Sequence, residues 1–301
     1  MPHNFFQTRQ TKTGWTISAP AKLNLFFEVL GKRDDGFHEI SSLAVPVSLY
    51  DTLHFEPADS DISFECCGGS DDVPLDGRNI VVKALEKFRQ RYNVEHGAKV
   101  KLVKQIPSQA GLGGGSSDAA AALFAARSAW KPEIPLPELS ALSAEIGSDC
   151  PMFFSGGAVI ISGRGEIIEP FDDCPPLHFV IFKPNEGLST AEVYRQCMPL
   201  HDGKIRNING LLSALRSGSL EDIGRNFFNR LEVPAAAVWN NFSAVKEQLE
   251  SAGCLAVRMT GSGTAFYGLC RNEEHSEAVA EKLQRQRAGE CAAVVKSLSA
   301  T

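Results

Sequence analysis

Apolar and polar residues alternate along much of the first third of the chain, from position 15 to position 57. A period of two places alternate side chains on opposite faces of a strand. A β-rich region is therefore predicted, with a long connection through the glycine- and aspartate-rich turn at 31–36. Between 79 and 92 the apolar residues instead recur at the spacing of an amphipathic helix, and strand alternation returns at 99–104.

The middle of the chain carries a glycine-rich segment, 107–118, directly before the alanine-rich run 118–126. Because alanine has the highest helix propensity, the predicted order is strand, glycine loop, helix. Prolines then interrupt the pattern before a short predicted helix at 138–146, and a hairpin is predicted at 156–168.

The second half of the sequence follows a proline-bearing stretch at 170–176, which we interpret as a domain boundary between residues 1–170 and 171–301. Strands are predicted at 178–182, 255–259, 265–270 and 292–297, and helices at 190–197, 209–216, 220–231, 235–252 and 274–287. Helices and antiparallel strands in this order favour an α+β fold over a doubly wound sheet.

The composition is that of a globular protein, with 301 residues of which 43% are hydrophobic and 22% charged. The formal net charge of −6 argues against binding to duplex nucleic acid, which needs a basic surface. No apolar run approaches the roughly 20 residues that span a bilayer, and Met1–Phe6 lack the residue order of a signal peptide. A cytoplasmic protein with no nucleic-acid or membrane partner is expected, and its eight scattered cysteines are expected to be reduced thiols.

The most informative segment is Pro107–Asp118, in which four of the five positions from Gly111 to Gly115 are glycine. Glycine lets backbone N–H groups approach a ligand closely, and the following helix adds its unpaired N–H groups and positive dipole end. This combination suits a polyphosphate. Ser116 or Ser117 can cap the helix, and either hydroxyl can also meet Mg²⁺ or a phosphate oxygen. The segment fits neither the Walker A pattern nor the dinucleotide fingerprint, and a flexible turn with an ordinary serine cap is the alternative.

Three other features are ambiguous when taken singly. Lys22 and Asn24 lie two apart in a predicted strand and share a face, although an edge strand with a solvated polar face also explains them. Asp149 stands at a turn before an apolar stretch, where a lone carboxylate is costly, although a capping or turn aspartate is commoner. The glycine turn at 261–263 fits a plain hairpin nearly as well as a ligand loop.

Together these segments resemble the GHMP kinase superfamily, named after galacto-, homoserine, mevalonate and phosphomevalonate kinases. The residues that carry the resemblance span most of the chain: Pro20–Leu25, Gly36–His38, Pro107–Asp118, Gly147–Met152 and Gly261–Gly268. The resemblance implies an ATP-dependent kinase that uses Mg²⁺ and acts as a monomer or homodimer. The implied fold is α+β, with an N-terminal domain like the second domain of ribosomal protein S5, a ferredoxin-like C-terminal domain, and the active site between them.

The resemblance also implies roles for single residues. Asp149 matches the catalytic aspartate that takes the hydroxyl proton, and Lys22 matches its lysine partner. Cys150, beside this base, is either sensitive to thiol alkylation or a buried inert thiol. No protein ligand of Mg²⁺ is assigned beyond the two serines of the loop. The implied ATP-binding residues are Asn79, Lys104, Pro107, Gly111, Gly113, Gly114, Gly115, Ser116 and Ser117.

Within the superfamily, the sequence is most similar to the members that phosphorylate 4-diphosphocytidyl-2-C-methyl-D-erythritol, a cytidine diphosphate-linked polyol of the non-mevalonate isoprenoid pathway. These members bind cytosine with an aromatic residue followed by His, here Phe37-His38, where the first position is usually Tyr. The implied substrate-binding residues are Asn24, Phe37, His38, Asp149, Thr190, Tyr194, Gly261, Ser262 and Gly263.

Two alternatives stay open at this point. Another small-molecule kinase of the superfamily would keep the phosphate loop but would not need Phe37, His38 and Tyr194. A non-catalytic nucleotide-binding regulator on the same scaffold would be expected to lack Lys22 or Asp149, and both are present.

Overall fold

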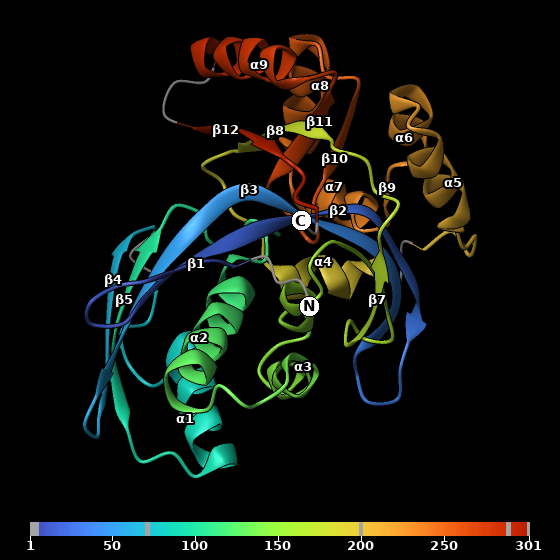
Figure 1. The fold of residues 1–301 in the computed structure, drawn as a ribbon. Coiled ribbons are helices and arrows are strands. Elements are labelled where there is room, and N and C mark those ends of the chain that lie inside the picture. Colours follow the sequence, from blue (N-terminus) through green and yellow to red (C-terminus); the bar gives the residue numbers. More distant parts are fainter. Residues whose placement is uncertain (1–5, 70–72, 199–200, 287–289, 300–301) are drawn as a thin grey trace.

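The computed structural model describes residues 6–69, 73–198, 201–286 and 290–299. Residues 1–5, on which the expectation of no signal peptide rested, lie outside these ranges. Arg287, the last residue of the helix predicted at 274–287, also lies outside them. The described chain forms two sheets with helices packed against them, so the predicted α+β composition is confirmed (Figure 1).

The larger sheet is built mainly by the N-terminal half of the chain. Its main path runs β1-β2-β3-β5-β4, with β6 on β3 and β7 on β6. The strands are β1 (Gln7–Gln10), β2 (Trp15–Lys32), β3 (His38–Ala58), β4 (Ile62–Gly68), β5 (Gly97–Lys104), β6 (Ala158–Ser162) and β7 (Ile167–Phe171). Neighbouring strands on this path are antiparallel apart from β4 and β5, which run parallel. The long alternating pattern of the sequence thus corresponds to the two longest strands, β2 and β3.

Three helices lie on one face of this sheet, below it in Figure 1. They are α1 (Ile80–Tyr92), α2 (Gly114–Trp130) and α3 (Leu136–Ala144), and a short 3₁₀ turn, Pro151–Phe154, follows α3. Every residue of α2 from Ser117 to Ala126 is buried, because this helix lies between the sheet and α1. Small alanine side chains allow that close approach, so the alanine run is explained by packing as well as by helix propensity.

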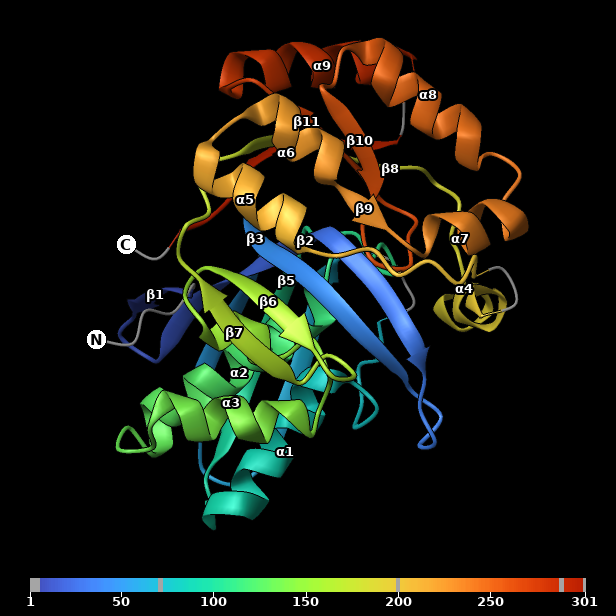
Figure 2. The ribbon, with the colours of Figure 1, turned by 90° about the vertical axis from the view of Figure 1, so that its right-hand side faces the viewer.

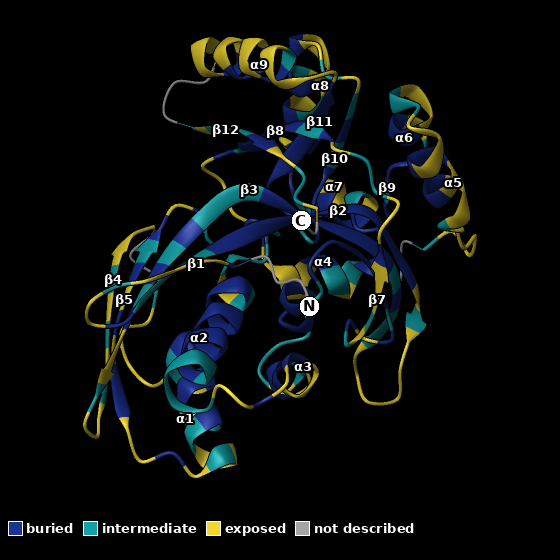
Figure 3. Ribbon diagram, viewed as in Figure 1, coloured by how far each residue is buried: buried dark blue, intermediate teal, exposed yellow. Residues whose placement is uncertain are grey.

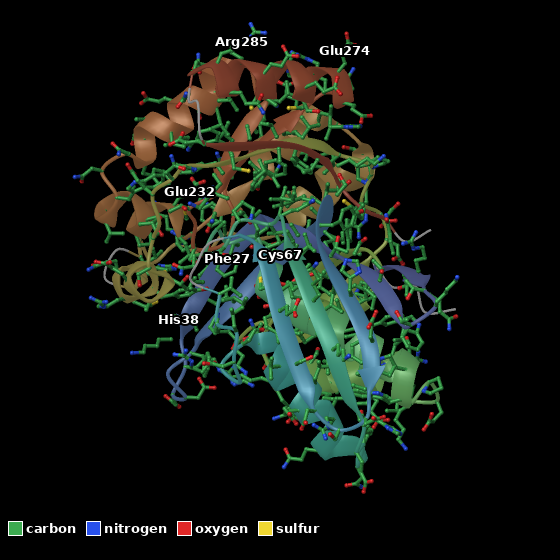
Figure 4. The ribbon with its side chains drawn as sticks, turned by 90° about the vertical axis from the view of Figure 1, so that its left-hand side faces the viewer. Phe27, His38, Cys67, Glu232, Glu274 and Arg285 are labelled. Atoms are coloured by element: carbon green, nitrogen blue, oxygen red, sulfur yellow. The ribbon has the colours of Figure 1, made fainter. Side chains whose placement is uncertain are left out.

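The smaller sheet is antiparallel and is formed by the C-terminal part of the chain, with the order β10-β11-β8-β12. Its strands are β8 (His178–Lys183), β10 (Ala256–Met259), β11 (Phe266–Cys270) and β12 (Cys291–Lys296). Two helices, α8 (Phe242–Ala252) and α9 (Glu273–Gln286), form the outer layer at the top of Figure 2. Glu274 and Arg285, near the two ends of α9, point into solvent there (Figure 4).

The remaining elements connect the two sheets. They are α4 (Thr190–Cys197), α5 (Asn209–Ser217), α6 (Leu220–Asn226), β9 (Phe228–Asn229) and α7 (Glu232–Val238). Although β9 belongs to the second half of the chain, it pairs in parallel with β2, where Phe27 lies opposite Asn229. The two halves of the molecule are therefore joined through backbone pairing. The boundary at residues 170 and 171 stays a prediction.

Two helix predictions were wrong in extent. The helix expected at 220–231 ends at Asn226, because the next residues pair with β2 as strand β9. The helix expected at 235–252 is two helices, α7 and α8, separated at Trp239. Trp239 has an extended backbone and packs its ring against Phe242 and Phe266, with ring centroids 6.1 Å away in each case. In both places a tertiary contact overrides the local helical pattern.

Buried residues follow the sheets and the inner faces of the helices, and the exposed residues lie on the outer helices and loops (Figure 3). None of the helices in the described ranges has both the length and the apolar character that a bilayer crossing requires.

Candidate active site

Strand β2 carries the first pair of predicted site residues, Lys22 and Asn24, and both are buried. Lys22 Nζ donates a hydrogen bond to Asn24 Oδ1. The Asn24 amide in turn donates to Ser42 Oγ of β3 at 2.9 Å. The alternative of an edge strand with a solvated polar face is wrong, because both side chains are buried. The two polar side chains thus face the interior of the protein.

The predicted base, Asp149, is brought to this lysine from the turn between α3 and the 3₁₀ segment. Its Oδ2 lies 3.9 Å from Lys22 Nζ, and its side chain is 46% exposed while that of Lys22 is 5% exposed. Burial lowers the pKa of Lys22, and the Asp149 carboxylate opposes this shift. The arrangement is a buried cation beside a carboxylate that solvent and small molecules can reach.

The glycine loop passes directly over Lys22. Gly113 has a φ of 70°, and a Cβ on it would lie 2.9 Å from Lys22 Cγ. The backbone N–H of Lys22 donates to the Leu112 carbonyl at 2.9 Å. A left-handed conformation and the close approach both require glycine at this position. The backbone of the loop therefore lies directly against the strand that carries Lys22.

The helix start differs from the prediction of a serine cap. The N-cap of α2 is Gly113, with no side-chain capping bond, and the helix begins at Gly114. Ser116 and Ser117 lie inside the first turn, so the serine-cap prediction is wrong for both. Their hydroxyls differ in surroundings: Ser116 lines the cavity described below, whereas Ser117 Oγ is buried with no hydrogen-bond partner among the described residues. Gly114, Gly115 and Ser116, the first residues of α2, line that cavity, and the N–H groups at a helix start have no partner within the helix.

A cavity of about 450 Å³ lies along the loop and the start of α1. Of the nine residues predicted to bind ATP, only Ser117 is not part of its lining. The eight that line it are Asn79, Lys104, Pro107, Gly111, Gly113, Gly114, Gly115 and Ser116. The Asn79 side chain is already engaged, since it accepts from Val81 N at 2.8 Å as the N-cap of α1 and donates to Pro74 O at 2.7 Å. Its contact with a nucleotide stays a prediction.

Lys104 lies beneath the loop and is paired with two buried carboxylates that the sequence analysis missed. Its Nζ donates to Asp51 and, at 2.7 Å, to Asp118 Oδ2. Burial opposes a charged lysine here, but Asp118 and Asp51 together raise the pKa of Lys104. Burial also raises the pKa of Asp118, to about 8. Asp51 Oδ1 accepts from Gln105 N and Ile106 N, so the cluster fixes the entry to the loop.

The predicted cytosine-binding residues lie around the start of β3 and the helix α4. The rings of His38 and Tyr194 are 5.1 Å apart between centroids, with an interplanar angle of 37°. Phe37 is 49% exposed, and the Arg164 guanidinium lies 5.1 Å from its ring centroid. Figure 4 shows His38 near the tip of the β2–β3 hairpin. Burial raises the pKa of Tyr194, and the Asp149 carboxylate adds to this shift.

The glycine turn after β10 closes the site from the other half of the chain. The hydroxyls of Ser262 and Thr190 are hydrogen-bonded at 2.8 Å. Thr260, missed from the sequence, accepts from Asn24 N at 3.1 Å and donates to Gly111 O at 3.2 Å. A Cβ on Gly111 would lie 2.1 Å from the Thr260 carbonyl, which explains this glycine. The turn thus touches both strand β2 and the glycine loop.

Cys150 follows the proposed base but is fully buried, and burial raises the pKa of its thiol to about 12. These features favour the inert thiol over the reactive one.

Comparison of the sequence with known proteins points to one family. The family model described as GHMP kinases N terminal domain matches residues 79–157, and the one described as GHMP kinases C terminal matches residues 211–289. The 4-diphosphocytidyl-2-C-methyl-D-erythritol kinase of Pelotomaculum thermopropionicum is 39% identical over 271 residues, which cover 90% of this chain and 94% of the relative.

Solved structures of kinases are also similar to this chain. A crystal structure of 4-(cytidine 5'-diphospho)-2C-methyl-D-erythritol kinase superposes with a TM-score of 0.80 at 34% identity and covers 93% of this chain and 98% of its own. The homoserine kinase of Cytophaga hutchinsonii has a TM-score of 0.74 at 18% identity over 97% of each chain. At that identity the second likeness concerns the fold alone.

Proposed function

The chain belongs to the GHMP kinase family, and from this membership we propose that it transfers the γ-phosphate of ATP to the 2-hydroxyl of 4-diphosphocytidyl-2-C-methyl-D-erythritol. The two-domain fold expected from the sequence is confirmed, and the protein is an ATP-dependent kinase. The choice of substrate, the place of the reaction in isoprenoid synthesis and the roles of single residues belong to the proposal. The observation that carries it is the Lys22–Asp149 pair beside the glycine loop.

In the proposed reaction Asp149 accepts the proton of the substrate hydroxyl as that oxygen attacks the γ-phosphorus. Lys22 Nζ, 3.9 Å away, orients the carboxylate and offsets the negative charge that develops on the transferring group. Asn24, which shares a hydrogen bond with Lys22, holds the polyol end. Most of the rate enhancement in such transfers comes from positioning and charge stabilisation, which suits a site made of rigid backbone contacts.

The phosphates of ATP would lie against the N–H groups at the start of α2, with the adenosine end in the cavity toward Asn79 and Lys104. Mg²⁺ is usually held by the phosphates, waters and one or two protein oxygens. No cluster of three or more acidic, histidine or cysteine side chains suited to a metal occurs in the described part of the chain. Ser116, which lines the cavity, would hold the ion through its hydroxyl. When bound, Mg²⁺ neutralises phosphate charge.

The cytidine end of the substrate is assigned to Phe37, His38 and Tyr194. The exposed Phe37 ring offers a stacking face, and Phe in place of the usual Tyr keeps stacking while it removes a hydroxyl. Thr190 and the turn at 261–263 complete this half of the site through the Thr190–Ser262 hydrogen bond. A cytoplasmic location and a monomeric or homodimeric state stay predictions from the sequence.

The proposal is tested by ATP consumption with Mg²⁺ against three alcohols side by side: 4-diphosphocytidyl-2-C-methyl-D-erythritol, mevalonate and homoserine. Turnover with the cytidine compound alone is the expected result. Turnover with mevalonate or homoserine instead would keep the phosphate-loop assignment and discard the cytidine pocket. ATP binding without turnover of any of them would favour the non-catalytic regulator.

A further inference from the structure

Strand β9 carries a buried amide whose two donor hydrogen bonds go to the backbone of the 259–261 turn. Asn229 is 3% exposed. Its Nδ2 donates to the carbonyls of Met259 and Gly261, both at 2.8 Å. Its Oδ1 accepts from Leu231 N at 2.9 Å. A single side chain therefore holds the chain on both sides of Thr260.

A carboxylate three residues later binds the same stretch at the backbone N–H of Met259. Glu232 Oε1 accepts from Met259 N at 2.8 Å, and Lys246 Nζ lies 3.6 Å from Glu232 Oε2. Burial raises the pKa of Glu232, while Arg258 and Lys246 oppose the shift. Figure 4 shows Glu232 in the upper layer, above Phe27 of the large sheet. We call Asn229 and Glu232 the β9 clamp.

The turn 259–261, which the β9 clamp holds, lies against the proposed catalytic lysine, Lys22. A Cβ on Gly261 would lie 3.5 Å from Lys22 Nζ and 3.3 Å from the Gly111 carbonyl. Thr260 Oγ1 bridges Asn24 N and Gly111 O. A movement of this turn by a fraction of an ångström would therefore change the surroundings of the lysine and the polyol-binding amide, while the phosphate loop keeps its own backbone bond to Lys22.

The β9 clamp is itself fixed to the strand that carries the lysine. Asn229 lies opposite Phe27 in the parallel pairing of β9 with β2, and Arg230 N donates to Phe27 O at 2.8 Å. The turn is thus held in place relative to β2 through a two-residue strand, although Thr260 and its partner Asn24 are 236 residues apart in the sequence.

We propose that Asn229 and Glu232 are positioning residues for phosphoryl transfer, which set the 259–261 turn against Lys22. The inference rests on the proposed role of Lys22 as partner of the base. It requires no contact of either residue with substrate. Because a displacement of about 1 Å at a catalytic group can reduce the rate on the order of 10²-fold, loss of the β9 clamp should act mainly on kcat.

The test compares Asn229→Ala and Asn229→Ser with the control Asn226→Ala, which removes one amide hydrogen bond to Asp222 O on α6, away from the turn. For the Asn229 variants we expect kcat to fall by about 30-fold or more. The Kd for ATP, measured by calorimetry, should stay within about threefold, because the loop keeps its backbone bond to Lys22. The control should retain wild-type kcat. A folded Asn229 variant with kcat within threefold of wild type would overturn the proposal.

Rescue by a conservative variant separates positioning from a general loss of folding. Glu232→Gln keeps an oxygen acceptor for Met259 N and should retain most of kcat, whereas Glu232→Ala should lose it as Asn229→Ala does. If Asn229→Ala fails to fold, Asn229→Ser and the Glu232 pair decide the question. Equal activity of Glu232→Gln and Glu232→Ala would refute the role of Glu232.

The role of Lys22 is checked in the same assay with Lys22→Ala. Full activity of that variant would refute the proposed role of Lys22 as partner of the base, whatever the activity of the Asn229 and Glu232 variants. An active wild type, an inactive Lys22→Ala and unaffected clamp variants would instead leave the proposed function intact and reject the clamp alone.

Discussion

Replacement of Asp149 by alanine is the most direct test of the proposed base. Its carboxylate lies 3.9 Å from Lys22 Nζ, with the aspartate side chain 46% exposed and the lysine 5% exposed. Two unit charges at this distance attract by about 4 kcal/mol near a protein surface and by about 1 kcal/mol in water. Since half of the carboxylate faces solvent, we expect a loss of stability nearer the lower figure, about 1 kcal/mol.

The effect on catalysis should be much larger than the effect on stability. A positioned general base contributes about 10²–10⁴-fold, so kcat should fall by an amount in this range. The phosphate loop makes none of its backbone contacts with Asp149 among the described hydrogen bonds, so ATP affinity should be spared. The matched variant Asp149→Asn keeps the size of the side chain and removes its charge.

The assay is steady-state ADP release with the cytidine substrate, combined with calorimetric titration of ATP and thermal unfolding of each variant. Reduced kcat with unchanged ATP binding in both variants is the expected outcome. Phosphoryl transfer within tenfold of wild type would show that another group takes the proton.

Three further changes test other parts of the site. His38→Ala should raise KM for the cytidine substrate with little change in kcat, and an unchanged KM would remove His38 from the pocket. Gly113→Ala places a Cβ 2.9 Å from Lys22 Cγ at a φ of 70°, so urea unfolding should show a loss of at least about 1–2 kcal/mol; an unaltered midpoint would contradict this account of the loop. In native protein at pH 8, iodoacetamide should modify the exposed Cys67 and spare Cys150, whose pKa burial raises to about 12. Rapid labelling of Cys150 that substrate blocks, detected by peptide mass spectrometry, would show a reachable thiol instead.

Local patterns in the sequence were enough to predict most elements and the place of the glycine loop. The alternation along 15–57 and the glycine loop before the alanine run depend on neighbours in sequence, and both are found where expected. The errors occur where distant residues decide the local structure. Strand β9 has only two residues, and its conformation is set by pairing with β2, so no periodicity of its own could reveal it. The break at Trp239 depends likewise on an aromatic contact made after folding.

The polar residues that were missed share a physical cause. Asp51 reads as one of many polar positions in a long strand, yet it accepts a hydrogen bond from Lys104, 53 residues away, and is fully buried. In the sequence, Asp118 is only a polar residue near a helix start, yet its Oδ2 lies 2.7 Å from Lys104 Nζ. A buried charge is costly alone and tolerable when it is paired, so its position is explained by its partner. Sequence order does not identify that partner, whereas glycine restrictions and hydrophobic periods act within a few residues. The place of the loop before its helix was therefore predictable, whereas the ion cluster at its entry required the fold.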